Sequence, residues 1–154
     1  MPNGKTPEET KVVTSELVLP GMTNLLGNLL GGKMMNSMDI TGALCCMRHC
    51  NSPVATVAVE AIEFKHPVRL GEMVSVEAKL VWVGRTSMKV KITATAENLS
   101  TGAVIVTNVA RFTFVALDKD GRKAQVPPLL PQTDEEKRDW QAEEDAYQRR
   151  LGAK

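Results

Sequence analysis

Apolar and polar positions along the chain follow two different periods, which predict one long helix followed by a run of strands. In residues 30–49 the apolar side chains recur at the helical spacing of three and four, and no proline interrupts them. In residues 87–97 apolar side chains alternate with lysine and threonine. The alternating apolar residues are Met88, Val90, Ile92, Ala94 and Ala96. A period of two is typical of a half-buried strand.

Four more β-prone stretches accompany this strand, at residues 11–19, 53–66, 72–83 and 103–117, and turns containing glycine or proline separate them. Consecutive strands with short turns form antiparallel sheets. We therefore expect an α+β fold in which an antiparallel sheet wraps around one long central helix. Because a single helix leaves the sheet edges and one helix flank uncovered, the pattern also predicts a homodimer.

The C-terminal segment differs in kind. Residues 126–131 form a proline-rich connector, and Thr133 with Glu136 forms a capping box that starts a charged helix running towards Leu151. Trp140, Tyr147 and Leu151 give this extra helix a thin apolar stripe, which we expect to dock on the body or on a neighbouring subunit. We divide the chain into a globular domain, residues 8–123, and a connector with a C-terminal helix, residues 124–154.

Charge and composition exclude several classes of partner. The formal net charge is +1, too small to draw the whole molecule to nucleic acid or to an anionic membrane. No apolar run reaches the roughly 18 residues of a membrane span, and residues 1–10 lack the apolar core of a signal peptide. Cys45, Cys46 and Cys50 share one helical segment, which is a poor disulfide framework. We expect a cytoplasmic protein.

One carboxylate interrupts the apolar part of the predicted helix. Asp39 shares an arc of the helical wheel with Met34, Met35, Met38, Gly42, Ala43, Cys45 and Cys46, and the helix looks buried around most of its circumference. Burial disfavours the charged form of a carboxylate, and such a group can act as a general base. Gly31 and Gly32 open the helix, where unpaired backbone N–H groups can bind an oxyanion. Simpler interpretations are a turn for the two glycines and a helix N-cap for Asn28.

These motifs together resemble a known family. The resemblance rests on Gly27-Asn28 with Gly31-Gly32, on Met38-Asp39 seven residues further, and on residues 48–50, 64–71 and 83–88. The chain is similar to the hot-dog-fold acyl-CoA thioesterases, and within them to the brain-type cytosolic acyl-CoA hydrolases and the YciA-like enzymes. The similar region extends over about residues 12–150.

The resemblance implies a hot-dog fold and hydrolysis of fatty acyl-CoA to free acid and CoA, a reaction of fatty acid metabolism, at sites shared between two subunits. Asp39 would activate water as the general base, Gly32 would hold the oxyanion, and Asn28 would orient the water or bind the thioester carbonyl. The turn residues Arg85, Thr86 and Ser87, with Lys89, would bind the CoA moiety, although a solvated hairpin tip is the simpler interpretation. Met35 and Met38 would contact the acyl chain or simply fill the core.

The partners and cofactors follow from the same resemblance. Acyl-CoA is the expected substrate, and no cofactor or metal is expected, because coenzyme A is part of the substrate and product. The minimal active unit is expected to be a homodimer, in an assembly such as a trimer of dimers. No nucleic acid or membrane partner is expected.

Other functions remain as alternatives. Cys45, Cys46, His49 and Cys50 invite a zinc hypothesis, but their spacing fits no familiar structural zinc pattern and one helix cannot surround a metal. The sequence has no Gly-x-Ser-x-Gly motif for a serine nucleophile, and His66, beside Pro67, is badly placed for a hot-dog dehydratase. A non-catalytic acyl-CoA-binding or sensing module is the remaining alternative, and the presence of both Asp39 and Asn28 argues against it.

Overall fold

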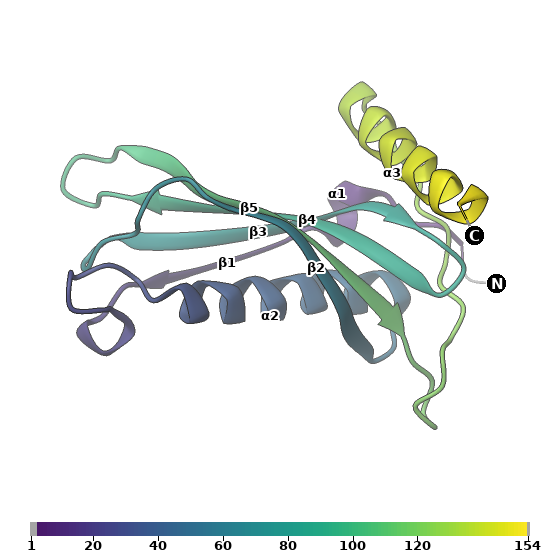
Figure 1. The fold of residues 1–154 in the computed structure, drawn as a ribbon, viewed down its shortest axis with the longest axis horizontal. Coiled ribbons are helices and arrows are strands. Elements are labelled where there is room, and N and C mark those ends of the chain that lie inside the picture. Colours follow the sequence, from purple (N-terminus) through teal and green to yellow (C-terminus); the bar gives the residue numbers. More distant parts are fainter. Residues whose placement is uncertain (1–2, 154) are drawn as a thin grey trace.

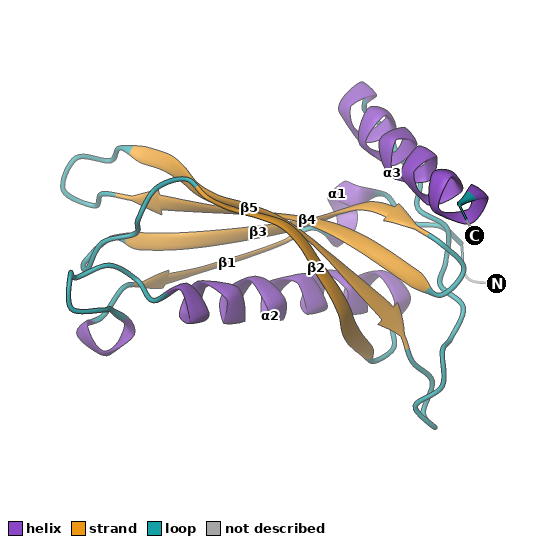
Figure 2. Cartoon of the chain, viewed as in Figure 1, coloured by secondary structure: helices purple, strands orange, loops and turns teal. Residues whose placement is uncertain are grey.

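A curved antiparallel sheet packs one of its faces against a single long helix, α2 (Gly31–Cys50), in the computed structural model (Figures 1 and 2). The structure describes residues 3–153. Residues 1–2, at the start of the polar N-terminal segment, and residue 154, at the end of the predicted tail, lie outside the described residues. The other elements are α1 (Pro7–Thr10), β1 (Val12–Leu17), the 3₁₀ turn Pro20–Met22, β2 (Val54–Phe64), β3 (Met73–Val83), β4 (Ser87–Glu97), β5 (Val104–Ala116) and α3 (Asp134–Gly152).

The strand order is β1-β3-β4-β5-β2, so β1 and β2 are the two edges of the sheet. All four pairings are antiparallel, which confirms the predicted α+β fold. The predicted helix and the five predicted strands are all present, with ends shifted by one or two residues. Only α1 is missed, because four residues are too few to display a helical period.

The core lies between the sheet and one side of α2. Leu80, Ile92, Phe112 and Phe114 are at most 1% exposed and come from three adjacent strands. Gly42 lets the helix approach this layer, since a Cβ atom there would lie 2.9 Å from Ile92 Cδ1 and 3.0 Å from Phe114 Cε2. A larger residue at position 42 would therefore push α2 away from the sheet.

The expectation that α2 is buried around most of its circumference is wrong for the single chain. Met35, Ile40 and Leu44 are 39%, 51% and 41% exposed, because the sheet covers only one side of the helix. A helix that carries three large apolar side chains into solvent requires another surface to cover them.

The end of α2 is anchored by the termini of the chain. His49 is fully buried, and its Nε2 lies 2.8 Å from the carbonyl oxygen of Pro127 in the connector. The Lys5 ammonium donates to the Arg48 carbonyl at 2.8 Å. Asn51 then ends the helix in a left-handed conformation with φ 56°. The connector is thus part of the packed body.

The three cysteines are free thiols, and burial raises the pKa of Cys45 to about 12. Within residues 3–153, no group of three or more histidine, cysteine, aspartate or glutamate side chains is placed to hold a metal ion. None of the helices in this range is both long enough and apolar enough to cross a membrane.

Helix α3 lies on the opposite face of the sheet from α2 (Figure 1). Its capping box between Thr133 and Glu136 forms as predicted. The helix docks on the body through a 2.8 Å ion pair between Lys79 and Glu136 and a 2.6 Å hydrogen bond from Trp82 Nε1 to Glu144. Leu151 is 46% exposed, so the predicted stripe stops at Tyr147, whose ring packs 5.1 Å from that of Trp82.

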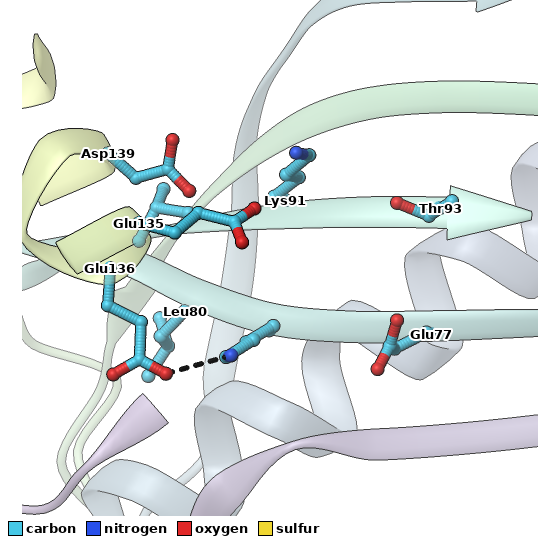
Figure 3. Close-up of a pocket in the computed structure, with 9 residues that line it drawn as sticks. Glu77, Leu80, Lys91, Thr93, Glu135, Glu136 and Asp139 are labelled. Carbon is cyan, nitrogen blue, oxygen red and sulfur yellow. Dashed lines mark ion pairs between the residues drawn. The ribbon is translucent and has the colours of Figure 1, made fainter. Parts of the chain in front are cut away.

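A cavity of about 180 Å³ separates the start of α3 from β3 and β4 (Figure 3). Glu135 and Asp139 face it from the helix, and Lys91 and Glu77 face it from the strands. Because this cavity lies on the α3 face, the sheet separates it from Asp39, and it takes no part in the site described below.

Candidate active site

Asp39 lies in the middle of α2, on the flank that faces β2. The hydroxyl of Thr56, on β2, donates a hydrogen bond to Asp39 Oδ1 at 2.6 Å. This length is typical of a strong hydrogen bond to a charged oxygen, so the carboxylate is held in one orientation. Asp39 is half-buried in the single chain, less than its apolar arc predicts, because the neighbouring helix flank is uncovered.

Thr56 is a site residue that the sequence analysis missed. It pairs with Phe114 of β5, whose side chain faces α2, and this register turns the threonine hydroxyl towards the helix. A register shift follows between Thr56 and Ala58. Because the shift interrupts the two-residue alternation, β2 gives no clear signal of which side chains face inward.

The start of α2 presents unpaired backbone donors. Leu30 occupies the N-cap position in an extended conformation and provides no side-chain cap. Met34 donates to the Leu30 carbonyl at 3.1 Å, so the N–H groups of Gly31, Gly32 and Lys33 come before the first helical hydrogen bond. A Cβ atom on Gly32 would meet no atom within 4 Å, which leaves open space beside its N–H group.

Asn28 is not the N-cap, so that simpler interpretation is wrong. It lies in a tight loop in which Asn24 Oδ1 accepts from the backbone N–H groups of Leu26 at 2.9 Å and of Asn28 at 3.2 Å. Gly27 allows the loop to turn with φ +80°. The side-chain oxygen of Asn28 is buried without a hydrogen-bond partner, which is a costly state that an additional ligand would relieve.

Gly32 and Asp39 lie on one side of α2 but not within reach of one small group. Seven residues at 1.5 Å and 100° each place them about 10 Å apart along the helix axis and within about 20° around it. A thioester carbonyl held at the Gly32 N–H group is therefore too distant for Asp39 of the same chain. One chain carries the two halves of a site without joining them.

The turn at residues 84–87 connects β3 and β4. Its backbone is fixed, since Gly84 donates to the Ser87 carbonyl at 2.8 Å and the carbonyls of Arg85 and Thr86 each accept at 2.9 Å. The Arg85 side chain is exposed, while Thr86 and Ser87 are half-buried. Arg85 makes no ion pair among residues 3–153, and its guanidinium is free to bind a phosphate.

Lys89 is in a different situation from Arg85. It is 4% exposed, and its ammonium lies 3.1 Å from Glu60 Oε1 and 3.0 Å from Glu143 Oε2. A phosphate would have to displace these carboxylates. The predicted role of Lys89 in CoA binding is therefore not supported by its surroundings, and the residue instead connects β4 with β2 and α3.

The two methionines predicted to contact the acyl chain also differ. Met38 is fully buried in the core, which supports core filling, the simpler of its two interpretations. Met35 is 39% exposed on the uncovered flank.

A cavity of about 100 Å³ opens at the start of α2. Gly31 and Met34 from the helix, Phe64 from β2, His66 from the following loop and Asn108 from β5 contribute to its lining. His66 thus faces a cavity beside the helix start, contrary to the expectation that it is badly placed. Asn108 was not recognised from the sequence, because it occupies an inward position in an otherwise apolar strand.

Comparison with known proteins agrees with this geometry. The Thioesterase superfamily model matches residues 26–103. The uncharacterized acyl-CoA thioester hydrolase YkhA of Bacillus subtilis (strain 168) is 35% identical over 84% of this chain and 75% of its own length. The human cytosolic acyl coenzyme A thioester hydrolase is 29% identical over 85% of this chain, which spans 35% of that longer protein.

A solved structure of an apo-hexameric acyl-CoA thioesterase matches with a TM-score of 0.92 and 34% identity, over 98% of this chain and 97% of that one. The sheet wrapped around α2 is the hot-dog fold that the resemblance implied. From the family match, the curated relative and the fold together, the chain belongs to the Thioesterase superfamily.

Proposed function

We propose that this protein hydrolyses the thioester of fatty acyl-CoA to free acid and CoA at a site shared between two subunits. The observation that carries the proposal is the separation of about 10 Å between Gly32 and Asp39 on one side of α2. A second copy that packs α2 against α2 in the opposite direction would bring the Gly32 N–H group of one subunit to Asp39 of the other.

Asp39 acts as the general base in this proposal. Its carboxylate takes a proton from water while the water oxygen attacks the thioester carbonyl carbon. The oxyanion that forms accepts a hydrogen bond from the N–H group of Gly32 in the partner subunit. When the tetrahedral intermediate collapses, the C–S bond breaks and the thiolate of CoA takes the proton back from Asp39. The reaction consumes one water and needs no metal or cofactor.

Asn28 completes the site from the partner subunit. Its amide either orients the attacking water or binds the thioester carbonyl. The buried and unpartnered Oδ1 atom supports a role that only the assembled site fulfils. The Arg85 guanidinium, exposed at the β3–β4 turn, would bind a phosphate of CoA, with the Thr86 and Ser87 hydroxyls beside it.

The assembly is proposed to be a trimer of dimers, with the homodimer as the minimal active unit. The hexameric state of a matching acyl-CoA thioesterase supports this size. A cytoplasmic location is supported by the three free cysteines and by the similarity to the human cytosolic enzyme. The net charge of +1 gives no reason to propose a nucleic acid partner.

Complementation between two inactive variants tests the shared site. Asp39→Asn and Asn28→Ala are each expected to lower kcat by at least a hundredfold, because each removes one half of every site. Co-expressed in equal amounts, the two chains should regain about a quarter of wild-type activity, since about half of random dimers are mixed and one of their two sites is intact. Release of free thiol from acyl-CoA, followed with a thiol reagent, measures the rate.

The matched control is Asp39→Asn co-expressed with the double variant Asp39→Asn/Asn28→Ala, which cannot form an intact site in any pairing. If the mixture of Asp39→Asn and Asn28→Ala is no more active than this control, the shared site is refuted. Near-normal turnover in Asp39→Asn alone would exclude Asp39 as the general base. Absence of thiol release from the wild-type protein with every acyl-CoA tested would favour the non-catalytic binding module.

A further inference from the structure

The cavity at the start of α2 has the features of a binding pocket for the acyl group. Leu29, Met34, Phe64 and Val68 supply apolar walls. Gly31, next to the proposed oxyanion donor Gly32, lines the same cavity. A thioester whose carbonyl lies at the Gly32 N–H group would therefore direct its acyl chain into this space.

One wall of the cavity is polar where an acyl pocket is expected to be apolar. Asn108 is 2% exposed, and it lies on the face of β5 that also carries Ala110, Phe112 and Phe114 against α2. Its side-chain amide forms no hydrogen bond with any of residues 3–153, whereas the neighbouring Thr107 hydroxyl donates to the Ala94 carbonyl. An amide that opens on a cavity without a protein partner can hydrogen-bond to a ligand there.

The volume of the cavity indicates how much of a ligand it can surround. An apolar cavity of about 150 Å³ accommodates benzene, with six heavy atoms. By proportion, 100 Å³ accommodates about four heavy atoms beyond the carbonyl. The pocket thus surrounds the first atoms of an acyl chain, and Asn108 is its buried hydrogen-bonding side chain, whereas His66 is exposed.

We propose that Asn108 is a specificity-determining residue and that this pocket selects acyl groups bearing a hydroxyl or oxo oxygen near the thioester. The Asn108 amide can donate to such an oxygen or accept from a hydroxyl. A saturated chain of the same length leaves the amide unpaired, and sites built around a hydrogen bond discriminate against ligands that lack it. This inference rests on the proposed function, because it needs the carbonyl to lie at the start of α2.

The test compares 3-hydroxybutyryl-CoA with butyryl-CoA as substrates of the wild type and of Asn108→Leu. The wild type should have the higher kcat/KM for the hydroxylated substrate. Asn108→Leu should lower the ratio of the two kcat/KM values by at least about tenfold, because it removes the partner of the hydroxyl. Thr107→Val is the matched control, since it exchanges a buried polar side chain for an apolar one outside the pocket and should leave the ratio unchanged.

Equal ratios in the wild type and Asn108→Leu would overturn the role of Asn108. Such a result leaves the proposed function intact as long as the wild type hydrolyses butyryl-CoA. If the wild type hydrolyses neither these substrates nor any other acyl-CoA tested, the proposed function fails, and calorimetry with the two non-hydrolysable thioether analogues tests the pocket. If the wild type binds the hydroxylated analogue at least about tenfold more tightly than the saturated analogue, and Asn108→Leu does not, the result would support the pocket. Equal binding of the two analogues to the wild type would refute it.

Discussion

At the scale of single residues, the environment of Asp39 is set by one hydroxyl group. Thr56 donates to its Oδ1 atom at 2.6 Å, and this bond fixes the carboxylate beside β2. A general base contributes only when it points at the water it deprotonates, so a freely rotating carboxylate loses part of its effect. In the proposed mechanism, Thr56 is therefore a positioning residue for Asp39.

Thr56→Val keeps the shape of the side chain and removes the donor. We expect kcat to fall about tenfold or more while KM changes little, because a hydrogen bond to a charged group is worth about 1.5–3 kcal/mol. Steady-state kinetics with an acyl-CoA substrate measures both constants. Thr56→Ser, which retains the hydroxyl, should recover most of the rate.

Thr113→Val is the comparison variant, since Thr113 lies on the outer face of β5 and its replacement should leave kcat unchanged. If Thr56→Ser were as slow as Thr56→Val, packing rather than the hydroxyl would explain the loss.

At the scale of elements, both ends of α2 depend on segments far away in sequence. The start of the helix is shaped by the Asn24–Asn28 loop, and its end is joined to the connector by the contact between His49 and the Pro127 carbonyl. Burial lowers the pKa of His49 below its usual value of 6.5. Between the lowered folded pKa and the unfolded pKa, the folded chain therefore keeps this imidazole neutral, whereas the unfolded chain already binds a proton.

The contribution of His49 to stability should be complete above about pH 6.5 and should diminish as the pH falls from the unfolded pKa towards the lowered folded pKa. Urea unfolding between pH 7.5 and 5 measures this slope. His49→Gln, whose amide nitrogen can still donate to Pro127, should have a shallower slope than the wild type. Equal slopes in the wild type and His49→Gln would contradict the role of His49.

At the scale of the whole molecule, the uncovered surfaces meet along one side. The flank of α2 with Met35, which lies one turn before Asp39, is exposed, and so are Val57 and Val59 on the edge strand β2. Asp39 lies between these two surfaces, bonded to Thr56 of β2. A second subunit that covered the flank would bury apolar surface and complete the site in one step.

Val57→Asp tests whether β2 is the subunit contact. We expect this variant to be monomeric and to lose at least a hundredfold in kcat, because an unpaired charge at a buried interface opposes association. Light scattering coupled to size-exclusion chromatography measures the assembly, and thiol release measures the rate.

Val13→Asp is the matched control for this variant. Val13 and Val57 have nearly equal exposure, 56% and 54%, but Val13 lies on the opposite edge strand, β1. Dissociation of Val13→Asp, or an intact oligomer in Val57→Asp, would place the contact elsewhere.

The sequence by itself determined the elements of this protein and pointed to the candidate groups of its site. The helical period, the alternation in β4 and the capping box at Thr133 are local signals, and each element they predicted is present. Asp39, Gly32 and Asn28 were identified because an acid within an apolar helix, two glycines at its start and their spacing are all visible in one short segment.

The tertiary structure alone decided which side chains meet. The hydrogen bond between Thr56 and Asp39, the burial of Met38, the pairing of Lys89 with two carboxylates and the amide of Asn108 in a cavity depend on strand order and register. These contacts join residues that are distant in the chain, and β-bulges in β2 shift its register. Local periodicity carries no information about such long-range pairing, so only the packed sheet could determine it.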